Sequence, residues 1–599
     1  GKLDTTILNN GLYNIRLTVY SDTKNISLEN VISVEGNMKI GNFSLSFQDM
    51  DFNVSGLPLT VIRTYDSRNR GTNGDFGYGW NMSTAGLTLT ESCNMSRYWK
   101  YTSSTGSLGN VNYDIKGTRA HIVTVNYGNG KTDKFTMTVK NAYQYYSPDY
   151  GVNVSFKAEN GSKSKLEIVG MDELALNSGM LLDRYDFSEF VYTKYRLTTQ
   201  DGTVYIIHKT NGVESVTEPN GSKVTFSAKG ITHSDGKSIV FDRDDKGRIK
   251  SIVSLTDKKV TYTYDENGDL ASVTDVSGEV TQFIYEDHYL TDIIDPRGVK
   301  VSRNIYDDSG RLIKTIDADG NEIKYDHDVD GREERITDRN GNVTRYIYDQ
   351  YGNILKQTDP MGNTVRNTYD KNGNPATKTD AMGNVTTYSY DSTGNMLTMT
   401  DAEGHTVTNE YNSKGQLTSI DAMGITAMTV AYDSKGNTTS TTDAMGNSID
   451  YSYDTKGRLT SVADEIGSYM NMTYDSNGNV ISATNGAGTT AQFTYDADGN
   501  CTAKTLTYTS DGAQKTVTEQ YFYDNSGNLV KIIDSDGNVT TTEYNSMGKV
   551  SSATDPSLVS AMVRFSSASL RRTTPKTRSP FYVNGVTMSH NTLPTVAEL

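Results

Sequence analysis

The stretch Asn384-Val-Thr-Thr-Tyr-Ser-Tyr-Asp-Ser-Thr-Gly-Asn-Met-Leu-Thr-Met-Thr-Asp401 contains each element of the predicted fold. Two runs rich in β-branched and aromatic residues flank the Gly394-Asn395 turn, and a second turn, Asp380-Ala-Met-Gly-Asn384, precedes the first run. Glycine permits a positive φ in such turns, and an Asp or Asn side chain can cap them. Tyr388 and Tyr390 are two positions apart, so they project from the same face of a strand. The stretch therefore predicts a β-hairpin with strands of about seven residues.

This hairpin unit is repeated along the chain with a period of 21 residues. The repeating position is Tyr in 13 of 14 units and His327 in the other, with seven residues inserted before the last two units. Gly follows four positions later in 13 of the 14 units, and the exception is Tyr289. A lone hairpin is marginally stable in water, so the units must stack on one another. The repeat predicts a long antiparallel ribbon that curls. The tyrosines of the series are Tyr264, Tyr285, Tyr306, Tyr348, Tyr369, Tyr390, Tyr411, Tyr432, Tyr453, Tyr474, Tyr495, Tyr523 and Tyr544.

The Tyr-Asp-x-x-Gly unit resembles the YD repeat of RHS proteins, which occur as bacterial wall-associated and polymorphic-toxin proteins, Tc toxin components and teneurins. The resemblance is strong over 264–555 and extends weakly back to about 196. It implies an all-β fold in which the hairpin ribbon winds into a hollow β-shell over 196–555.

The function implied by this resemblance is that of a non-catalytic fragment of a secreted or cell-wall-associated bacterial RHS protein. Its shell would scaffold or enclose a C-terminal toxin or effector that is missing from this chain. The alternative is a surface adhesin that binds carbohydrate. Tyrosines such as Tyr388 and Tyr390 could stack on sugar rings, or they could stabilise cross-strand ladders. His327 is interpreted as a tolerated aromatic substitution rather than a pH switch.

The N-terminal third is predicted to form two further parts. Residues 37–195 are interpreted as the β module that precedes YD repeats in RHS proteins, because 43–83 resemble it. Within this module the glycine-rich stretch Gly74–Trp80 is interpreted as a tight turn anchored by a buried Trp, although a ligand loop is the functional alternative. Residues 1–36 are similar to the end of an Ig-like β-sandwich, so the chain is expected to begin within a domain.

Composition restricts the function classes. The sequence contains 40 Tyr but only 15 Phe, has 53 Gly, and is 35% hydrophobic, which is typical of half-exposed aromatic strands joined by turns. No run of about 18 apolar residues occurs, so no membrane span is predicted. The net charge of −16 disfavours nucleic acid as a partner. Two cysteines, Cys93 and Cys501, cannot build a disulfide scaffold or a four-thiolate zinc site.

The search for chemistry predicts no catalytic, cofactor-binding or metal-binding residue. Asp326-His-Asp-Val-Asp-Gly331 matches the first half of an EF-hand loop, but Thr337 stands where a bidentate Glu is needed. Toxin-type RHS proteins have a self-cleaving aspartyl site on two closely spaced Asp-Pro-x-Gly motifs. Here the motifs Asp295–Gly298 and Asp359–Gly362 are 64 residues apart, so that site is not expected.

The final segment, 556–599, is predicted to be a disordered tail that lies outside the fold. It carries five basic residues and one acid, together with four of the ten prolines of the chain. The abrupt change after Asp555-Pro556 suggests a shifted reading frame, and the alternative is a basic tail that docks on an anionic wall polymer. We expect deletion of this segment to leave the stability of the shell unchanged.

Overall fold

The fold is described from a computed structural model of the chain. Among the residues that the structure describes, β-strands predominate, two short 3-10 helices are present, and no helix is long and apolar enough to cross a membrane. The described residues are 11–19, 26–34, 41–52, 54, 57–82, 87–105, 111–127, 132–143, 146–159, 161–171, 173–525, 527–544, 550–554, 579–583 and 586–590.

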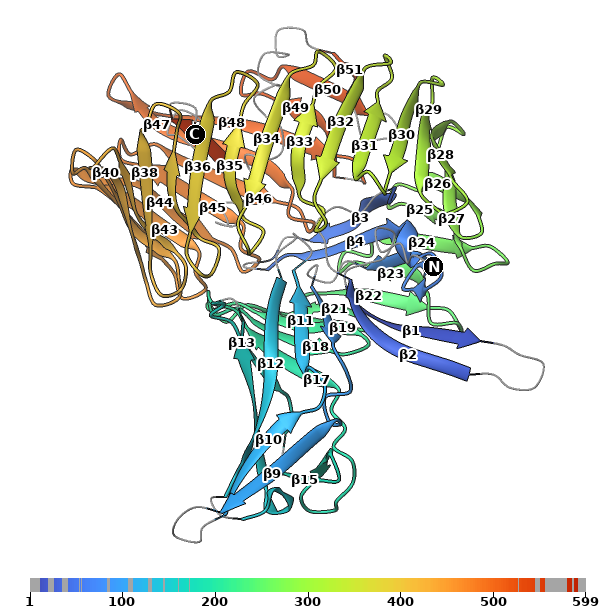
Figure 1. Cartoon of the computed structure of the whole chain (residues 1–599). Helices are drawn as coiled ribbons and strands as arrows, with labels where there is room; N and C mark the ends of the chain where they lie inside the picture. Colours follow the sequence, from blue (N-terminus) through green and yellow to red (C-terminus); the bar gives the residue numbers. More distant parts are fainter. Residues whose placement is uncertain are drawn as a thin grey trace.

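One antiparallel sheet of 36 strands contains all the YD hairpins, and Figure 1 shows that it curls round on itself. Strand order follows chain order after β14, so each strand pairs with the strands before and after it. The predicted all-β fold of wound hairpin repeats is therefore confirmed. The strands of this sheet, in order, are β14 (Lys165–Ile168), β17 (Lys194–Thr198), β18 (Val204–His208), β19 (Gly212–Thr217), β20 (Lys223–Ser227), β21 (Gly230–His233), β22 (Ser238–Arg243), β23 (Ile249–Val253), β24 (Lys259–Tyr264), β25 (Leu270–Thr274), β26 (Val280–Glu286), β27 (Tyr289–Ile294), β28 (Lys300–Tyr306), β29 (Leu312–Asp317), β30 (Glu322–Asp328), β31 (Glu333–Thr337), β32 (Val343–Tyr348), β33 (Ile354–Thr358), β34 (Thr364–Tyr369), β35 (Pro375–Thr379), β36 (Val385–Tyr390), β37 (Met396–Thr400), β38 (Thr406–Tyr411), β39 (Leu417–Ala422), β40 (Ile425–Tyr432), β41 (Thr438–Asp443), β42 (Ser448–Tyr453), β43 (Leu459–Asp464), β44 (Gly467–Tyr474), β45 (Val480–Asn485), β46 (Thr490–Tyr495), β47 (Cys501–Ser510), β48 (Ala513–Tyr523), β49 (Leu529–Ile533), β50 (Val539–Tyr544) and β51 (Val550–Ala553).

The N-terminal part forms several smaller sheets, and in Figure 1 its six-stranded sheet projects away from the wound ribbon. The six-stranded sheet has the order β16-β15-β13-β12-β11-β8, and a three-stranded sheet has the order β3-β4-β7. The pairs β1-β2, β5-β6 and β9-β10 each form a two-stranded sheet. The bounds of these elements are β1 (Gly11–Val19), β2 (Ile26–Val34), β3 (Ser44–Phe52), β4 (Leu59–Asp66), η1 (Ser67–Asn69), β5 (Asn73–Gly74), β6 (Gly77–Tyr78), β7 (Trp80–Met82), β8 (Thr88–Glu91), β9 (Trp99–Thr105), β10 (Val111–Gly117), β11 (Ile122–Asn126), β12 (Thr132–Asn141), η2 (Pro148–Tyr150), β13 (Val152–Ala158), β15 (Leu174–Asn177) and β16 (Met180–Asp183).

The wound sheet begins earlier than the predicted boundary at 196. Strand β14 lies within the range assigned to the preceding module, yet it pairs with β17 and so opens the ribbon. The sequence of 165–168 has no Tyr-Asp-x-x-Gly motif. Its side chains are alternately exposed and buried, as in any half-buried strand, so the sequence does not mark it as part of the ribbon. The assignment of 1–36 to an Ig-like remnant stays a prediction.

Residues 556–599 differ in part from the prediction of disorder. Strands β52 (Ser579–Val583) and β53 (Val586–His590) pair in a two-stranded sheet of their own. The sequence contains the signal for it, because Asn584-Gly585 separates two runs rich in β-branched and aromatic residues, a typical hairpin pattern. The remainder of the segment lies outside the described residues, so the predicted frame shift stays a prediction.

The hairpin turns are fixed by an Asp that acts as a side-chain clamp. In the turn after Tyr390, Asp391 Oδ1 accepts hydrogen bonds from the backbone N–H groups of Thr393 and Asn395, and Asp391 Oδ2 accepts one from Asn395 Nδ2. The turn at 380–384 repeats this arrangement, with Asn384 Nδ2 donating to Asp380 Oδ2. The same Asp-x-x-Gly-Asn chemistry therefore closes both ends of the hairpins.

The predicted positive φ of the turn glycine is confirmed at Gly394, where φ is 86°. A valine at this position is expected to lower the free energy of unfolding by about 1–3 kcal/mol, because a β-branched residue is strained at positive φ. Since the hairpins stack, amide exchange should also accelerate in the neighbouring β35 and β38. Thr387→Val is the matched control, because Thr387 is an exposed strand residue whose change should cost less than about 0.5 kcal/mol. Equal stability of the two variants would contradict this mechanism.

Candidate functional site

In most of the units the repeating tyrosine ties its hairpin to the one before it. Tyr369 donates its hydroxyl hydrogen to the carbonyl oxygen of Ile354 at 3.0 Å, and Tyr411 does the same to Met396 at 2.9 Å. Each acceptor lies 15 residues upstream, at the start of a preceding strand. The ring is half-buried and its hydroxyl group has a hydrogen-bond partner. This agrees with the interpretation that these tyrosines stabilise the sheet rather than stack on sugar rings. The other hydroxyls that bond a backbone carbonyl 15 or 16 residues upstream are those of Tyr264, Tyr306, Tyr432, Tyr474, Tyr495 and Tyr544.

His327 performs the same task and also forms an ion pair. Its Nε2 lies 2.7 Å from the carbonyl oxygen of Leu312, and its Nδ1 lies 2.7 Å from Glu334 Oε2. Both side chains of this pair are buried. In the other YD hairpins a β-bulge precedes the tyrosine, but β30 and β31 pair without one. This different register places Glu334 beside the ring, a feature that the sequence-based interpretation as a simple substitution did not include.

Two more polar side chains lie close to this pair. Arg311 is buried and influences the pKa of His327, while the buried hydroxyl of Tyr348 has no hydrogen-bond partner. Burial and the nearby Glu334 raise the pKa of Tyr348 to about 12. The anomalous unit therefore concentrates four ionisable groups, Arg311, His327, Glu334 and Tyr348, within an otherwise regular sheet.

The His327 pair predicts that stability depends on pH. Burial alone would lower the pKa of His327, but the Glu334 carboxylate and the Leu312 carbonyl outweigh it, so the net pKa is raised above 6.5. A raised pKa contributes stability that is complete below pH 6.5 and is lost as pH rises through the folded-state pKa. We expect the urea concentration at the unfolding midpoint to decrease as pH rises from 6.5 through the folded-state pKa of His327, and we expect His327→Tyr to remove that part of the decrease. An unchanged pH profile in His327→Tyr would contradict the assignment.

A seam between successive windings closes the wall of the ribbon. Turns between first-winding strands contact the YD turns of strands more than 200 residues later: Gln200 Nε2 donates to the carbonyl oxygen of Ser413 at 3.1 Å, and Lys258 Nζ lies 2.9 Å from Asp498 Oδ2. Thr256 also donates its hydroxyl hydrogen to Asp498. One winding therefore takes about ten to twelve of the 21-residue units.

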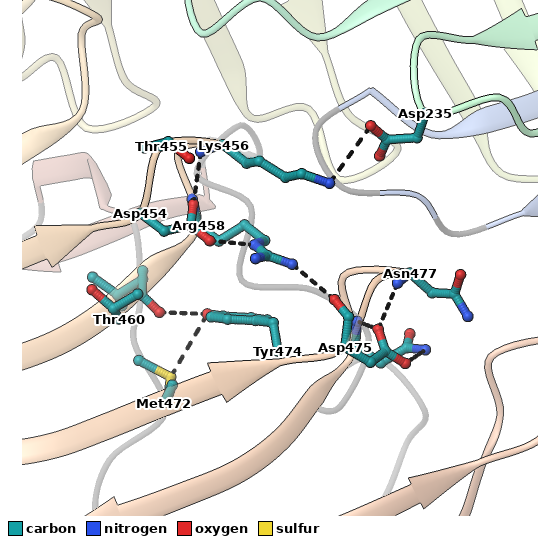
Figure 2. A network of polar contacts seen from close by, with 12 residues as sticks. Asp235, Asp454, Thr455, Lys456, Arg458, Thr460, Met472, Tyr474, Asp475 and Asn477 are labelled. Atoms are coloured by element: carbon teal, nitrogen blue, oxygen red, sulfur yellow. Dashed lines mark hydrogen bonds and ion pairs between the residues drawn. The ribbon is translucent and has the colours of Figure 1, made fainter.

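Figure 2 shows the seam where Asp235 reaches Lys456, with Asp235 Oδ1 3.7 Å from Lys456 Nζ. On the same side, Arg458 pairs with Asp454 at 2.6 Å and donates to the carbonyl oxygen of Asp475 at 3.0 Å. The Arg458 guanidinium also lies 4.7 Å from the ring centre of Tyr474. The seam is thus polar, and its side chains come from the turns of the hairpins.

The first strands of the wound sheet are covered by the N-terminal module. Strands β3, β4 and β7 pack on β20 to β27 of the wound sheet, and Leu59, Tyr65, Phe76 and Trp80 are fully buried there. Trp80 Nε1 donates to the hydroxyl oxygen of Tyr285 at 2.7 Å. The interpretation of Gly74–Trp80 as a turn anchored by a buried Trp is therefore confirmed, and we call β3 to β7 the plug.

The plug also explains the one YD unit without a turn glycine. After Tyr285 the hairpin shortens to a two-residue turn at Asp287 and His288, both with positive φ. The Tyr65 hydroxyl donates to the carbonyl oxygen of His288 at 2.9 Å, and Arg70 donates to that of Asp287 at 3.1 Å. Docking of the plug on this turn replaces the usual Asp clamp.

The aspartates that the sequence analysis considered as metal ligands or as a self-cleaving site stabilise hairpin turns. Asp328 Oδ1 accepts the backbone N–H of Gly331 in the hairpin between β30 and β31, which is not an EF-hand helix pair. Asp295 and Asp359 each accept two backbone N–H groups of their own turns. These two aspartates lie six strands apart along the sheet, roughly 29 Å, so the structure does not bring them together.

One group with metal-ligand chemistry escaped the sequence analysis. Ligand atoms of Asp401, Glu403 and His405 lie within 4.8 Å of one another in the turn before β38. His405 takes the place of the usual Asn and pairs through Nδ1 with Asp401 Oδ2 at 2.9 Å. The sequence could have indicated this group, because His405 replaces the Asn of the usual Asp-x-x-Gly-Asn turn. The contact of His405 with Asp401 is the one that the Asn makes in the other turns.

A single antiparallel sheet of hairpin repeats, wound around a docked plug and sealed by contacts between windings, defines a β-shell protein. The chain belongs to the teneurin YD-shell family, whose family model matches residues 4–323 and 418–558 and thus more than half of the chain. The RHS repeat model matches residues 327–364 and 369–406 between them. The chain is therefore an RHS-repeat shell protein.

Comparison with solved structures gives distant likenesses. The crystal structure of TcdB2-TccC3 without its hypervariable C-terminal region is 16% identical, with a TM-score of 0.38 over 78% of this chain and 28% of that chain. The Tc holotoxin pore of Photorhabdus luminescens is 12% identical, with a TM-score of 0.33 over 83% of this chain and 31% of that chain. This chain spans less than a third of the length of those chains. The sequence has no match among curated proteins.

Proposed function

We propose that this chain is the wall of a secreted or cell-surface bacterial RHS shell that encloses or scaffolds a C-terminal effector and has no catalytic activity of its own. The observation that carries the proposal is the uneven filling of the wound sheet. The plug covers β20 to β27, and the six-stranded module packs against β14 and β17 to β19, each with a large cluster of buried apolar side chains. In the later winding the buried clusters contain only four and three residues.

The part of the wound sheet beyond the strands that the plug covers suits a cargo that is held without tight binding. The side chains on the tyrosine face of β36, Thr386, Tyr388 and Tyr390, are half-buried. Their ladder of aromatic rings and hydroxyl groups is polar at its tips and apolar between them. Such a surface can contact an unfolded or partly folded chain without a specific site, and a specific site is not needed for enclosure.

The test is protection of a reporter domain fused after Leu599 with a protease site in its linker. We expect cleavage at least about tenfold slower than for the same reporter added separately to the chain, because an enclosed linker is out of reach of the protease. Opening the shell with urea should abolish the difference. Equal cleavage rates in the folded fusion and in the mixture would contradict enclosure.

A carbohydrate-binding surface is the second candidate, and an aromatic cluster on the six-stranded module favours it. Tyr146 and Tyr150 form an edge-to-face pair with ring centres 5.6 Å apart, and Arg184 lies 5.1 Å from the ring centre of Tyr143 and donates to its hydroxyl. Nearby in sequence, Tyr185 is largely exposed. Exposed aromatic faces beside charged groups suit sugar rings better than the half-buried tyrosines of the ribbon do.

A glycan array and a pull-down with bacterial cell wall separate the two candidates. If the module binds carbohydrate, Tyr146→Ala with Tyr150→Ala should abolish retention, while Tyr388→Ala with Tyr390→Ala should leave it unchanged. Retention that depends on Tyr388 and Tyr390 instead would place binding on the ribbon. Absence of retention in the unmodified chain would exclude the adhesin function.

A further inference from the structure

Three successive hairpins of the wound sheet carry basic residues on the face opposite the repeating tyrosines. Within each strand of these hairpins the basic residue occupies the third position, and it recurs every 21 residues in both strands. We call these residues the basic row, and they lie on the adjacent strands β29 to β34 (Figure 1). Because neighbouring strands are about 4.8 Å apart, the row extends over roughly 24 Å. Its members are Lys314, Lys324, Arg335, Arg345, Lys356 and Arg366.

Within each of these hairpins two cations stand directly opposite each other. Like charges at such cross-strand positions destabilise a sheet. In the two hairpins that follow, the equivalent positions hold Thr377 opposite Thr387 and Thr398 opposite Thr408, so the repeat itself does not require cations there. The three hairpins therefore hold these cations at a cost in stability. The opposed pairs are Lys314 with Lys324, Arg335 with Arg345, and Lys356 with Arg366.

Carboxylates compensate the first two pairs only in part. A single carboxylate, Glu322, lies 2.9 Å from Lys314 Nζ and 3.1 Å from Lys324 Nζ. Glu333 is shared in the same way by the two arginines of the second pair, at 2.6 and 2.7 Å, and Asp326 adds a contact of 3.4 Å. The arginine side chains remain 45% and 51% exposed. Because exposed ion pairs are weak, these cations stay available to a ligand.

The third pair, Lys356 and Arg366, has no carboxylate partner among the residues that the structure describes. The strands β32 to β35 contain no Asp or Glu at all. Arg366 is exposed and Lys356 is half-exposed. The whole chain carries a net charge of −16, so this uncompensated positive charge differs from the rest of the protein. We expect the positive potential of the row to be strongest at β33 and β34.

The basic row lies away from the surfaces at which parts of this chain meet. Contacts between windings are made by turns, as between Lys258 and Asp498, whereas the row lies in the strands. Windings that meet through their turns leave the row accessible. The plug packs on the tyrosine face of the sheet, where the rings of Phe76 and Tyr262 are 4.9 Å apart, and so lies on the side opposite to that of the row.

We propose that the basic row binds a linear polyanionic glycan, in which phosphate or carboxylate groups recur along the polymer. The glycan lies across the strands, and its acidic groups pair with successive Lys and Arg side chains. A periodic row of three cation pairs suits a polymer better than one small anion, which could contact only one pair. The aromatic residues of these strands, such as Tyr325 and Tyr346, lie on the tyrosine face, so the bases of a nucleic acid find no ring to stack on. The choice of a glycan rests on the surface location proposed above.

The test is biolayer interferometry of the full chain on immobilised polymers at low salt. Teichoic acid supplies phosphate groups, polygalacturonate supplies carboxylates, and dextran is the uncharged glycan. We expect binding to at least one acidic polymer, no binding to dextran, and a loss of affinity as salt is added. Lys356→Glu with Arg366→Glu should weaken binding at least about tenfold. The matched control is Lys223→Glu with Lys259→Glu, which makes the same charge change on exposed lysines of β20 and β24 and should alter affinity less than about twofold.

A second measurement separates a binding role from a structural one. Lys356→Thr with Arg366→Thr copies the pair of Thr377 and Thr387 in the next hairpin. Because this change removes a like-charge pair, we expect a higher urea midpoint together with weaker binding of the acidic polymer. If the two cations served the fold alone, the urea midpoint would decrease instead.

Several outcomes would overturn the proposal, with circular dichroism showing an intact sheet in every variant. One is the absence of binding to both acidic polymers, and another is an equal loss of binding in the control variant. Tighter binding of single-stranded DNA than of either glycan would assign the row to nucleic acid instead. Binding that is lost in Tyr146→Ala with Tyr150→Ala but not in the row variants would place it on the six-stranded module. None of these results depends on whether a fused reporter is protected, so enclosure is tested separately.

Discussion

Replacement of Arg63 by alanine is expected to lower the free energy of unfolding by about 3–5 kcal/mol, because it leaves a buried carboxylate without its partner. Arg63 lies in β4 of the plug, and its Nε is 2.9 Å from Asp49 Oδ2. The two side chains are only 2% and 5% exposed. Asp49 also accepts the hydroxyl hydrogen of Tyr262, a ribbon residue, at 2.8 Å.

Aromatic rings surround the same guanidinium group. Its central carbon lies 4.5 Å from the ring centre of Trp80, 4.7 Å from that of Phe47 and 5.3 Å from that of Phe283. Phe283 belongs to β26, so the cation contacts both the plug and the wound sheet. A desolvated cation–π contact contributes about 2 kcal/mol. Alanine removes these contacts together with the ion pair, which is why we expect so large an effect.

Urea denaturation followed by tryptophan fluorescence measures this change, since Trp80 is one of only two tryptophans. Arg68→Ala is the matched control, because Arg68 pairs with Asp66 in a more exposed position and should cost less than about 1 kcal/mol. Removing both charges and the orphaned hydroxyl, with Arg63→Met, Asp49→Leu and Tyr262→Phe, should restore most of the stability. A cost below about 1 kcal/mol for Arg63→Ala would show that this pair does not hold the plug.

The repeating part of the fold could be predicted because its information is local. Each hairpin needs only two short strands and two Asp-x-x-Gly turns, and this pattern is repeated along the chain with a period of 21 residues. The clamp by Asp391 and the positive φ of Gly394 follow from the chemistry of a single turn. The exception at Gly331, where Arg332 takes the positive φ instead, arises from a change of register that one unit alone does not reveal.

The seam and the plug could not be predicted, because their contacts join residues far apart in the sequence. The hydrogen bond between Gln200 and Ser413 spans 213 positions, and that between Tyr65 and His288 spans 223. Which residues form such contacts depends on the angle by which each hairpin is rotated relative to the one before it. This angle cannot be predicted from the composition of the strands.

Replacement of Gly77 by valine is expected to detach the plug from the ribbon, at a cost of about 2–5 kcal/mol. Gly77 has a φ of 92°, which strains a β-branched residue. A Cβ atom there would lie 2.6 Å from the carbonyl oxygen of Gly268, in the first YD turn. Because that obstacle is backbone, it cannot rotate away, and the plug must move as a whole.

Gly71→Val separates this effect from a general weakening of the plug. Gly71 lies in the same connection, and a Cβ atom there would meet nothing within 4 Å, so its change should cost less than about 0.5 kcal/mol. In Gly77→Val we expect Trp80 to become accessible to a fluorescence quencher while amide protection of β36 to β46 persists. If the later winding loses protection as well, the plug is part of the folding unit of the whole shell. If neither changes, the contact between Gly77 and Gly268 is not what seats the plug, and the closed first winding must depend on the Arg63 cluster alone.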